Sequence, residues 1–361
     1  MRVLIVDDSV VFRSAIRTAL ERLPGIEVVG AAANGKIALE KIKQLSVDLI
    51  TLDMEMPDLD GIETLKQLRA AGHRQTVVVF SSMTTLGAER AIDALRFGAD
   101  EVVAKPAQSE EGGIEGAVEK VRFALLPIIE AFRSKWAPAP RSSPAGDTSS
   151  VGYSPPASLN IGLPPSLLRF RPAVLVIGSS TGGPMALENL FIALKDAVPR
   201  VPILICQHMP PVFTASLAKR LEVVCGIPAS EGLQGESIKP GRIYVAPGDY
   251  HMVLAKGPNG AMVRLHQGPA VNSVRPAVDP LFESAAEVFG ASVLSVVLTG
   301  MGADGAIGAE RIRGVGGKVL IQDQASCVVF GMPGAVAEKK AFDGMGDPTS
   351  IGQFIRRMIS E

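Results

Sequence analysis

The sequence predicts two α/β units with mainly parallel sheets, and an antiparallel hairpin in the second unit that turns at Lys256–Gly260. Strand-like and helix-like segments alternate on both sides of a stretch, about residues 137–165, that is rich in Pro, Ser, Ala and Gly. This alternation is typical of doubly wound sheets with helices on both faces. The 361 residues, 47% of them hydrophobic, suffice for two cores. We therefore expect one domain at residues 1–125, a helix end and flexible linker at 126–171, and a second domain at 172–361.

Composition excludes several classes of protein. The net charge is −1, so no bulk attraction to nucleic acid or anionic lipid is expected. The three cysteines are widely spaced and form no metal-ligand pattern and no disulfide framework, which fits a reducing compartment. There is no signal-peptide pattern and no run of the roughly 20 apolar residues that a membrane helix requires. We expect a cytoplasmic protein with no nucleic-acid partner and no direct membrane insertion.

Five apolar, strand-like segments lie in the first domain, with amphipathic segments between them. They are Arg2–Val6, Glu27–Ala31, Leu49–Leu52, Thr76–Phe80 and Glu101–Ala104. In a doubly wound sheet, ligand chemistry gathers at the carboxyl ends of the strands. The residues at those ends are therefore the first candidates for a functional site.

Three carboxylates, a hydroxyl and an amine follow these strands: Asp7, Asp8, Asp53, Ser81 and Lys105. Carboxylates that converge repel one another, so a hard divalent cation such as Mg²⁺ is their natural partner. The hydroxyl and the lysine would complete a site for a phosphoryl group. Each residue alone has a simpler explanation, as a helix cap, a turn former or a solvated side chain. Their joint occurrence at four strand ends favours the phosphoryl site.

Three motifs carry a family resemblance. Val3–Ser9, Leu52–Gly61 and Ala104–Pro106 resemble the receiver domain of two-component response regulators, over residues 1 to about 125. The resemblance implies a flavodoxin-like fold with five parallel strands. It also implies that a chemotaxis histidine kinase is the phosphodonor and that Asp53 is the phosphoacceptor.

The remaining roles also follow from this resemblance. Ser81 and Lys105 would contact the phosphoryl group. Mg²⁺ would be held by Asp7, Asp8, Asp53 and the backbone carbonyl of Glu55. In one respect the chain departs from the family: many receivers carry an aromatic residue three positions before the lysine, where this chain has Val102.

The second domain opens with a strand that ends in a Gly-rich turn. Residues 173–184 read AVLVIGSSTGGP, and Ser180 is the centre of a G-x-S-x-G pattern. A serine on such a strand-to-helix turn can present its hydroxyl outward beside backbone N–H groups. A phosphate-binding loop at a helix N-terminus, or a plain Gly-rich turn, would show the same sequence pattern.

Two further strand ends offer partners for Ser180. His208 follows the buried strand at 201–207, and Asp304 lies in a Gly-rich loop after a strand at 292–298. A lone histidine is more often structural, and a lone Asp-Gly is by default a turn. Together they suggest a nucleophile, a base and a carboxylate that orients the base. The order Ser, His, Asp excludes the usual α/β-hydrolase arrangement, which runs Ser, Asp, His.

Five motifs of this domain resemble the chemotaxis protein-glutamate methylesterases, the CheB family, over about residues 172–358. They are GSSTGGP at 178, QHMP at 207, VAPG at 245, LTGMGADG at 298 and GMP at 331. The family often has His-Arg-Pro-Ser where this chain has Val274–Ala277. None of the three candidate catalytic residues is affected by this departure.

The resemblance implies a reaction. Ser180 would attack a glutamate γ-methyl ester on a methyl-accepting chemotaxis receptor, His208 would accept its proton, and backbone N–H groups of Thr181 and Met301 would hold the oxyanion. Methanol would leave, no cofactor would take part, and receptor glutamines could be deamidated by the same nucleophile. The unphosphorylated receiver would cover the esterase site. A nucleotide-binding domain, a DNA-binding regulator and a non-catalytic scaffold are the alternatives.

Overall fold

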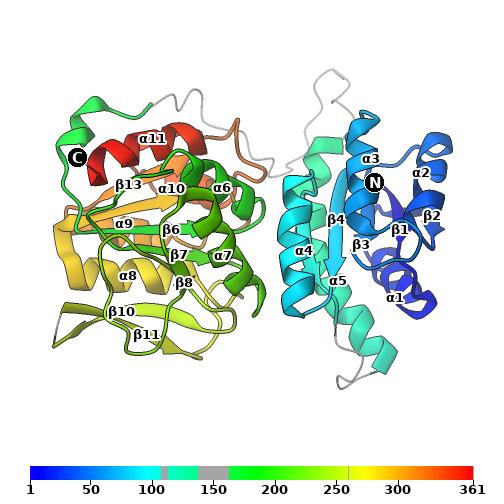
Figure 1. Cartoon of the computed structure of the whole chain (residues 1–361), viewed down its shortest axis with the longest axis horizontal. Coiled ribbons are helices and arrows are strands. Elements are labelled where there is room, and N and C mark those ends of the chain that lie inside the picture. The colour runs from blue at the N-terminus through cyan, green and yellow to red at the C-terminus, as the bar shows by residue number, and fades with distance from the viewer. Residues whose placement is uncertain (107–112, 137–161, 259, 361) are drawn as a thin grey trace, which may run out of the picture.

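The structure, a computed structural model, describes residues 1–106, 113–136, 162–258 and 260–360. These residues form two α/β domains that lie side by side (Figure 1). Most of the predicted linker, residues 137–161, falls outside the described residues. Its described end contains a 3-10 helix, η1 (Pro165–Arg169), which contacts the last helix of the second domain.

The N-terminal domain contains a five-stranded sheet in the order β2-β1-β3-β4-β5, and every pair of neighbouring strands is parallel. This confirms the predicted fold. The strands are β1 Arg2–Val6, β2 Glu27–Ala32, β3 Leu49–Asp53, β4 Thr76–Ser81 and β5 Glu101–Ala104. The helices are α1 Val10–Glu21, α2 Gly35–Gln44, α3 Gly61–Ala70, α4 Thr85–Arg96 and α5 Gly113–Trp136.

Each sheet face of this domain is covered by its own helices. Helices α1 and α5 pack over one face, where Ile16 and Leu125 are fully buried. Helices α2, α3 and α4 cover the other face, where Leu65 and Ala91 are fully buried. The first four helices begin where a side-chain oxygen accepts a backbone N–H of the first turn, from Ser9, Asn34, Asp60 and Thr84.

The C-terminal domain contains a seven-stranded sheet in the order β14-β13-β12-β6-β7-β9-β8, again with parallel pairs throughout. An antiparallel hairpin forms a separate small sheet, as predicted. The strands are β6 Val174–Ser179, β7 Ile203–Gln207, β8 Ala229–Glu231, β9 Ile243–Val245, β10 His251–Gly257, β11 Gly260–His266, β12 Val293–Val297, β13 Lys318–Gln322 and β14 Gly344–Gly346.

The helices of this domain also divide between the two faces of its sheet. Helices α6 (Gly183–Ile192), α7 (Phe213–Cys225) and α11 (Pro348–Ile359) bury one face. Helices α8 (Val278–Phe289), α9 (Ala306–Gly314) and α10 (Met332–Glu338) bury the other, and the hairpin packs against α8. Short 3-10 helix η2 (Gly290–Ser292) leads into β12. Because helices cover both faces, the strands of this sheet are buried on both sides, which accounts for their nearly continuous apolar sequences.

The two domains contact each other through helices. Helix α4 packs against α6 and α7, and Figure 1 shows α4 and α5 on the side of the first domain that faces the second. The Lys219 ammonium lies 2.7 Å from a carboxylate oxygen of Glu89, and the Arg96 guanidinium lies 3.6 Å from Glu188. The first domain is thereby placed next to the carboxyl edge of the second sheet.

Among the described residues, the structure contains no helix with the length and apolar character needed to cross a membrane.

Candidate active site

Three neighbouring strands of the second sheet bring the candidate catalytic residues to one edge. Strands β12, β6 and β7 are adjacent and parallel, so their carboxyl ends lie together. Ser180 and His208 follow β6 and β7 directly, and Asp304 lies at the end of the loop after β12. Ser180, His208 and Asp304 line one cavity of about 350 Å³, together with Thr181 and Met301.

Asp304 is buried and holds His208. Its Oδ2 lies 2.7 Å from His208 Nε2 and also accepts the backbone N–H of Val278 at 2.6 Å. Burial alone would raise the pKa of Asp304. The charge and hydrogen bond of His208 and the N–H groups of Val278 and Asp279 outweigh that effect, so the pKa is lowered. Asp304 is therefore ionised near neutral pH.

This contact fixes which imidazole nitrogen is available for chemistry. A neutral histidine donates through one ring nitrogen and accepts through the other. Because Asp304 accepts from Nε2, Nδ1 of His208 is the nitrogen that can accept a proton. Within the described part of the chain, the Ser180 hydroxyl makes no hydrogen bond; such contacts are often loose before substrate binds.

Two side chains to which the sequence motifs gave no role, those of Gln207 and Thr299, hold the turn that carries Ser180. The Gln207 amide donates to the Ser180 carbonyl at 2.9 Å and accepts the Ser179 hydroxyl at 2.7 Å. On the other side, the Thr299 hydroxyl donates to the Thr181 carbonyl at 3.0 Å. Their signal in the sequence was their position, because both stand at the ends of strands that flank β6.

Glycine is required at two positions of this turn. Gly182 has a φ of 73°, which side chains rarely adopt. A Cβ on Gly183 would collide with the side chain of Gln207 that supports the turn. The Gly-rich pattern thus lets the chain turn sharply out of β6 and into α6.

The predicted carboxylates of the first domain also come together. Oxygen atoms of Asp7, Asp8 and Asp53 all lie within 4.8 Å of one another. The Lys105 ammonium lies 2.6 Å from Asp53 Oδ2 and 3.0 Å from Asp7 Oδ2. A set of three hard oxygen donors fits Mg²⁺.

Burial has a marked effect on Asp53. It raises the pKa of Asp53 to about 6, although Lys105 and the backbone N–H of Glu55 act in the opposite direction. Lys105 therefore holds in place a carboxylate that is fully enclosed.

Ser81 follows the strand next to the one that carries Asp53. It is buried at the end of β4, and its hydroxyl donates to the carbonyl of Gly87 in α4 at 2.7 Å. The side chain of Glu55 accepts from the Ser82 hydroxyl at 3.0 Å. The structure thus joins Lys105 to the acidic cluster directly, and it joins the Ser81 hydroxyl to α4.

The first domain forms part of the walls around Ser180. Phe123, Leu126, Pro127 and Glu130 of α5 line the same 350 Å³ cavity as Ser180. A second cavity of about 280 Å³ is lined by residues of both domains: Glu101, Val102, Val103, Ala104, Ala124, Ile128, Ser180, Thr181, His208 and Pro210. Val102, which stands in place of the family's aromatic residue, therefore faces the candidate active site.

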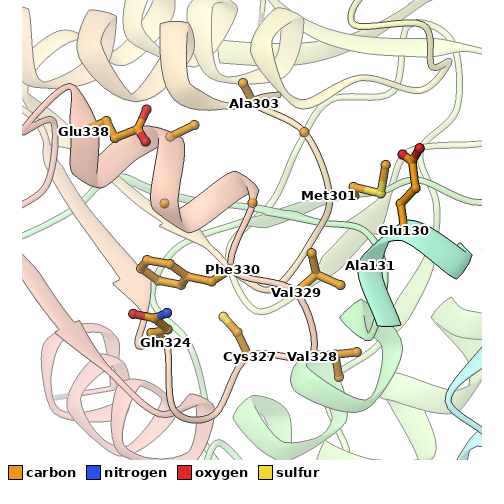
Figure 2. Close-up of a pocket in the computed structure, with 14 residues that line it drawn as sticks. Glu130, Ala131, Met301, Ala303, Gln324, Cys327, Val328, Val329, Phe330 and Glu338 are labelled. Atoms are coloured by element: carbon orange, nitrogen blue, oxygen red, sulfur yellow. The ribbon is translucent and has the colours of Figure 1, made fainter. Parts of the chain in front are cut away.

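A larger cavity of about 710 Å³ adjoins this region. Figure 2 shows it with Glu130 of α5 and Glu338 of α10 at two of its sides. Met301, Gly302 and Ala303 line both this cavity and the one that contains Ser180. The first domain thus contributes a wall to every cavity described around the candidate nucleophile.

Comparisons with known proteins agree with this arrangement. Residues 175–355 match the sequence model of CheB methylesterase, and residues 3–113 match that of the response regulator receiver domain. A protein-glutamate methylesterase/protein-glutamine glutaminase of Trichodesmium erythraeum is 43% identical over 99% of both chains. One of Nocardioides is 44% identical over 93% of this chain and 89% of the relative.

A solved structure gives the same result for the second domain. The CheB methylesterase catalytic domain of Thermotoga maritima is 40% identical, with a TM-score of 0.50. It covers 52% of this chain and 99% of the solved one. Both domains match family models in the expected order, and a relative is 43% identical over nearly the whole chain. The chain therefore belongs to the CheB methylesterase family.

Proposed function

We propose that the protein is a phosphorylation-activated serine esterase for sensory adaptation. Its substrates would be glutamate γ-methyl esters on methyl-accepting chemotaxis receptors, and its product methanol. The observation that carries this proposal is the shared cavity of Ser180, His208 and Asp304 at three adjacent strand ends. The names of the relatives, protein-glutamate methylesterase/protein-glutamine glutaminase, support the substrate class.

In the proposed mechanism, His208 acts as the base. Its Nδ1 accepts the proton of the Ser180 hydroxyl while Nε2 remains on Asp304. Ser180 attacks the ester carbonyl, and the N–H groups of Thr181 and Met301 hold the oxyanion. Protonated His208 gives its proton to the departing methanol. Water then hydrolyses the acyl-enzyme and regenerates the glutamate carboxylate. A receptor glutamine would follow the same path with ammonia as the leaving group.

Phosphorylation of Asp53 would control this reaction. Asp7, Asp8, Asp53 and the Glu55 carbonyl would hold Mg²⁺, which when bound offsets the negative charge of a phosphoryl group. Lys105 would contact the same group. A histidine kinase is the proposed phosphodonor. The α5 side chains in the Ser180 cavity support the idea that the unphosphorylated receiver limits access of a receptor helix.

The test is release of methanol from methylated receptor. The Ser180→Ala variant should lose it by about three orders of magnitude or more, because no nucleophile remains. The Ser166→Ala variant is the matched control: it removes an exposed hydroxyl on η1 that does not line the Ser180 cavity, so the activity should stay near that of the wild type. Full activity in Ser180→Ala would contradict the proposal.

A further inference from the structure

The side chain of Asn272 makes an unusual pair of contacts. Its amide nitrogen donates to Asp304 Oδ1 at 3.0 Å and to Asp279 Oδ2 at 3.1 Å. Both carboxylates are buried, with 1% and 3% of their surfaces exposed. One amide therefore joins the carboxylate that holds His208 to a second acidic group that has no part in the proposed mechanism.

The local backbone is shaped to present this amide. Val271 and Val274 exchange two backbone hydrogen bonds, of 3.1 and 3.0 Å, around a two-residue turn. The turn residues Asn272 and Ser273 both have positive φ, 52° and 67°. Such hairpin turns favour Asn because it tolerates this region. Although Asn272 is exposed at the turn, its amide points inward to the two carboxylates.

The two carboxylates cannot both remain charged without help. Burial, together with the charge of Asp304, raises the pKa of Asp279 to about 6. Asp279 also accepts the backbone N–H of Gly308 at 2.8 Å. Two buried carboxylates repel each other, and this repulsion raises the pKa of one of them. A donor placed between them satisfies one oxygen of each and reduces the repulsion.

The environment of the pair is otherwise acidic or neutral. The titratable groups that act on Asp279 or Asp304 are Glu283 on α8, Cys206 and His208 at the end of β7, and His251 on β10. Of these, only His208 lies in hydrogen-bond contact with Asp304. The N–H donors and Asn272 therefore decide how Asp304 holds that imidazole.

From these contacts we propose that Asn272 is a positioning residue: its amide bridges Asp304 and Asp279 and fixes the Asp304 carboxylate toward His208. The inference rests on the proposed esterase function. It also ties the Val271–Val274 turn, whose Asn272, Ser273 and Val274 line the Ser180 cavity, to the carboxylate that orients the base.

The experiment compares two glycine variants in the full-length protein. Asn272→Gly and Asp196→Gly both relieve a positive φ, but only the first removes the bridging amide; Asp196 is exposed and does not line the Ser180 cavity. Asn272→Gly should lower kcat for methanol release by roughly ten- to a hundredfold, the range expected for a hydrogen bond to a charged group, with KM nearly unchanged. Asp196→Gly should stay within about twofold of the wild type.

The pH profile supplies a readout that a purely structural role would not move. Its acidic limb reports protonation of the groups that must be unprotonated for the reaction, and Asp304 contacts the proposed base. Loss of the amide leaves Asp304 with fewer donors, so this limb should move to higher pH in Asn272→Gly. It should move further in Asn272→Asp, which adds a third carboxyl group. Equal kcat values in the two glycine variants, or an acidic limb that stays in place in both Asn272 variants, would overturn the proposal.

The outcome for Asn272 is separable from the outcome for the esterase itself. Ser180→Ala is measured in the same assay, and its activity bears on the nucleophile alone. If that variant is inactive and Asn272→Gly matches the wild type, the esterase stands and the positioning role fails. If Ser180→Ala is active, the function on which the positioning role depends fails.

Discussion

Glu101 of the receiver domain lies beside the turn that carries Ser180. Its carboxyl oxygen Oε2 is buried, and burial raises the pKa of Glu101 to about 7. The backbone N–H groups of Val102 and Gly182 and the Thr181 hydroxyl offset part of this effect. The residue that approaches the proposed oxyanion site from the first domain is thus an acid that is partly protonated at neutral pH.

A pH dependence of basal activity follows. With the domains in contact, Glu101 has a pKa of about 7, against an ordinary value of 4.5 when exposed. We call the form in which the receiver domain contacts the second domain the closed form. Between these two pKa values the closed form binds more protons than the form with separated domains. Closure, the formation of this contact, is therefore most favourable at low pH and weakens as pH rises through about 7. The ratio of unphosphorylated full-length activity to that of residues 162–361 should rise over this window. The ratio cancels the pH dependence of the esterase reaction itself, because both proteins contain the same second domain.

Glu101→Gln tests the assignment. It removes the titrating charge, so the activity ratio should become independent of pH and lie below the wild-type ratio at pH 7.5 or above. The matched control is Glu89→Gln, which removes an exposed ion pair with Lys219 and should change the ratio by less than about fivefold. A Glu101→Gln profile that retains the wild-type slope would assign the dependence to another group.

At the scale of elements, the Gly-rich loop after β12 packs closely on the turn after β6. A Cβ on Gly300 would lie 2.8 Å from the Cβ of Ser180 and would collide with the sulfur of Met332. Gly300→Ala should therefore displace Ser180 and lower kcat by about tenfold or more, with a loss of roughly 1–3 kcal/mol in unfolding free energy. Urea titration and methanol release measure the two effects.

The control for this prediction lies on α9. Gly314 has open space around its Cβ position and no positive φ. Gly314→Ala should leave kcat unchanged and alter stability by less than about 1 kcal/mol. If both alanine variants behave alike, close packing between the two turns is not what positions Ser180.

Sequence alone predicted the elements better than the contacts between them. The apolar runs that form β1 and β3 are followed by Asp residues, so the ends of these strands were predicted to within about one residue. Ser180, His208 and Asp304 were found because strand ends are where parallel sheets gather polar groups. Asn272 and Asp279 were missed because one lies in a hairpin turn and the other in the first turn of a helix. Only the fold brings them to Asp304.

At the scale of the whole molecule, the contact of α4 with α6 and α7 could not be predicted from either domain alone. It depends on surface residues such as Glu89, Arg96 and Lys219, whose pattern in the sequence resembles any solvated helix face. The same arrangement brings α5 to the cavity of Ser180.

Removing the first domain tests this arrangement. A chain that starts at Gly162 keeps η1, whose Leu167 is buried in the core of the second domain. Its basal esterase activity should exceed that of the unphosphorylated full-length chain by about tenfold or more, if closure involves most of the molecules. Phosphorylation should raise the activity of the full-length protein toward the same level, and Asp53→Ala should block that rise. Equal basal activities would remove the role of closure.

The receiver domain, whose helix α5 lines the Ser180 cavity, belongs to the same polypeptide as Ser180. Dilution of the protein should therefore not separate the two domains. Closure within one chain is a first-order equilibrium, so the inhibited fraction should be the same at nanomolar and at micromolar protein. A separate receiver fragment added to residues 162–361 must instead reach the effective concentration that the covalent connection provides, on the order of millimolar for short flexible tethers. The covalent connection would therefore let the same contact limit activity to the same extent at any protein concentration.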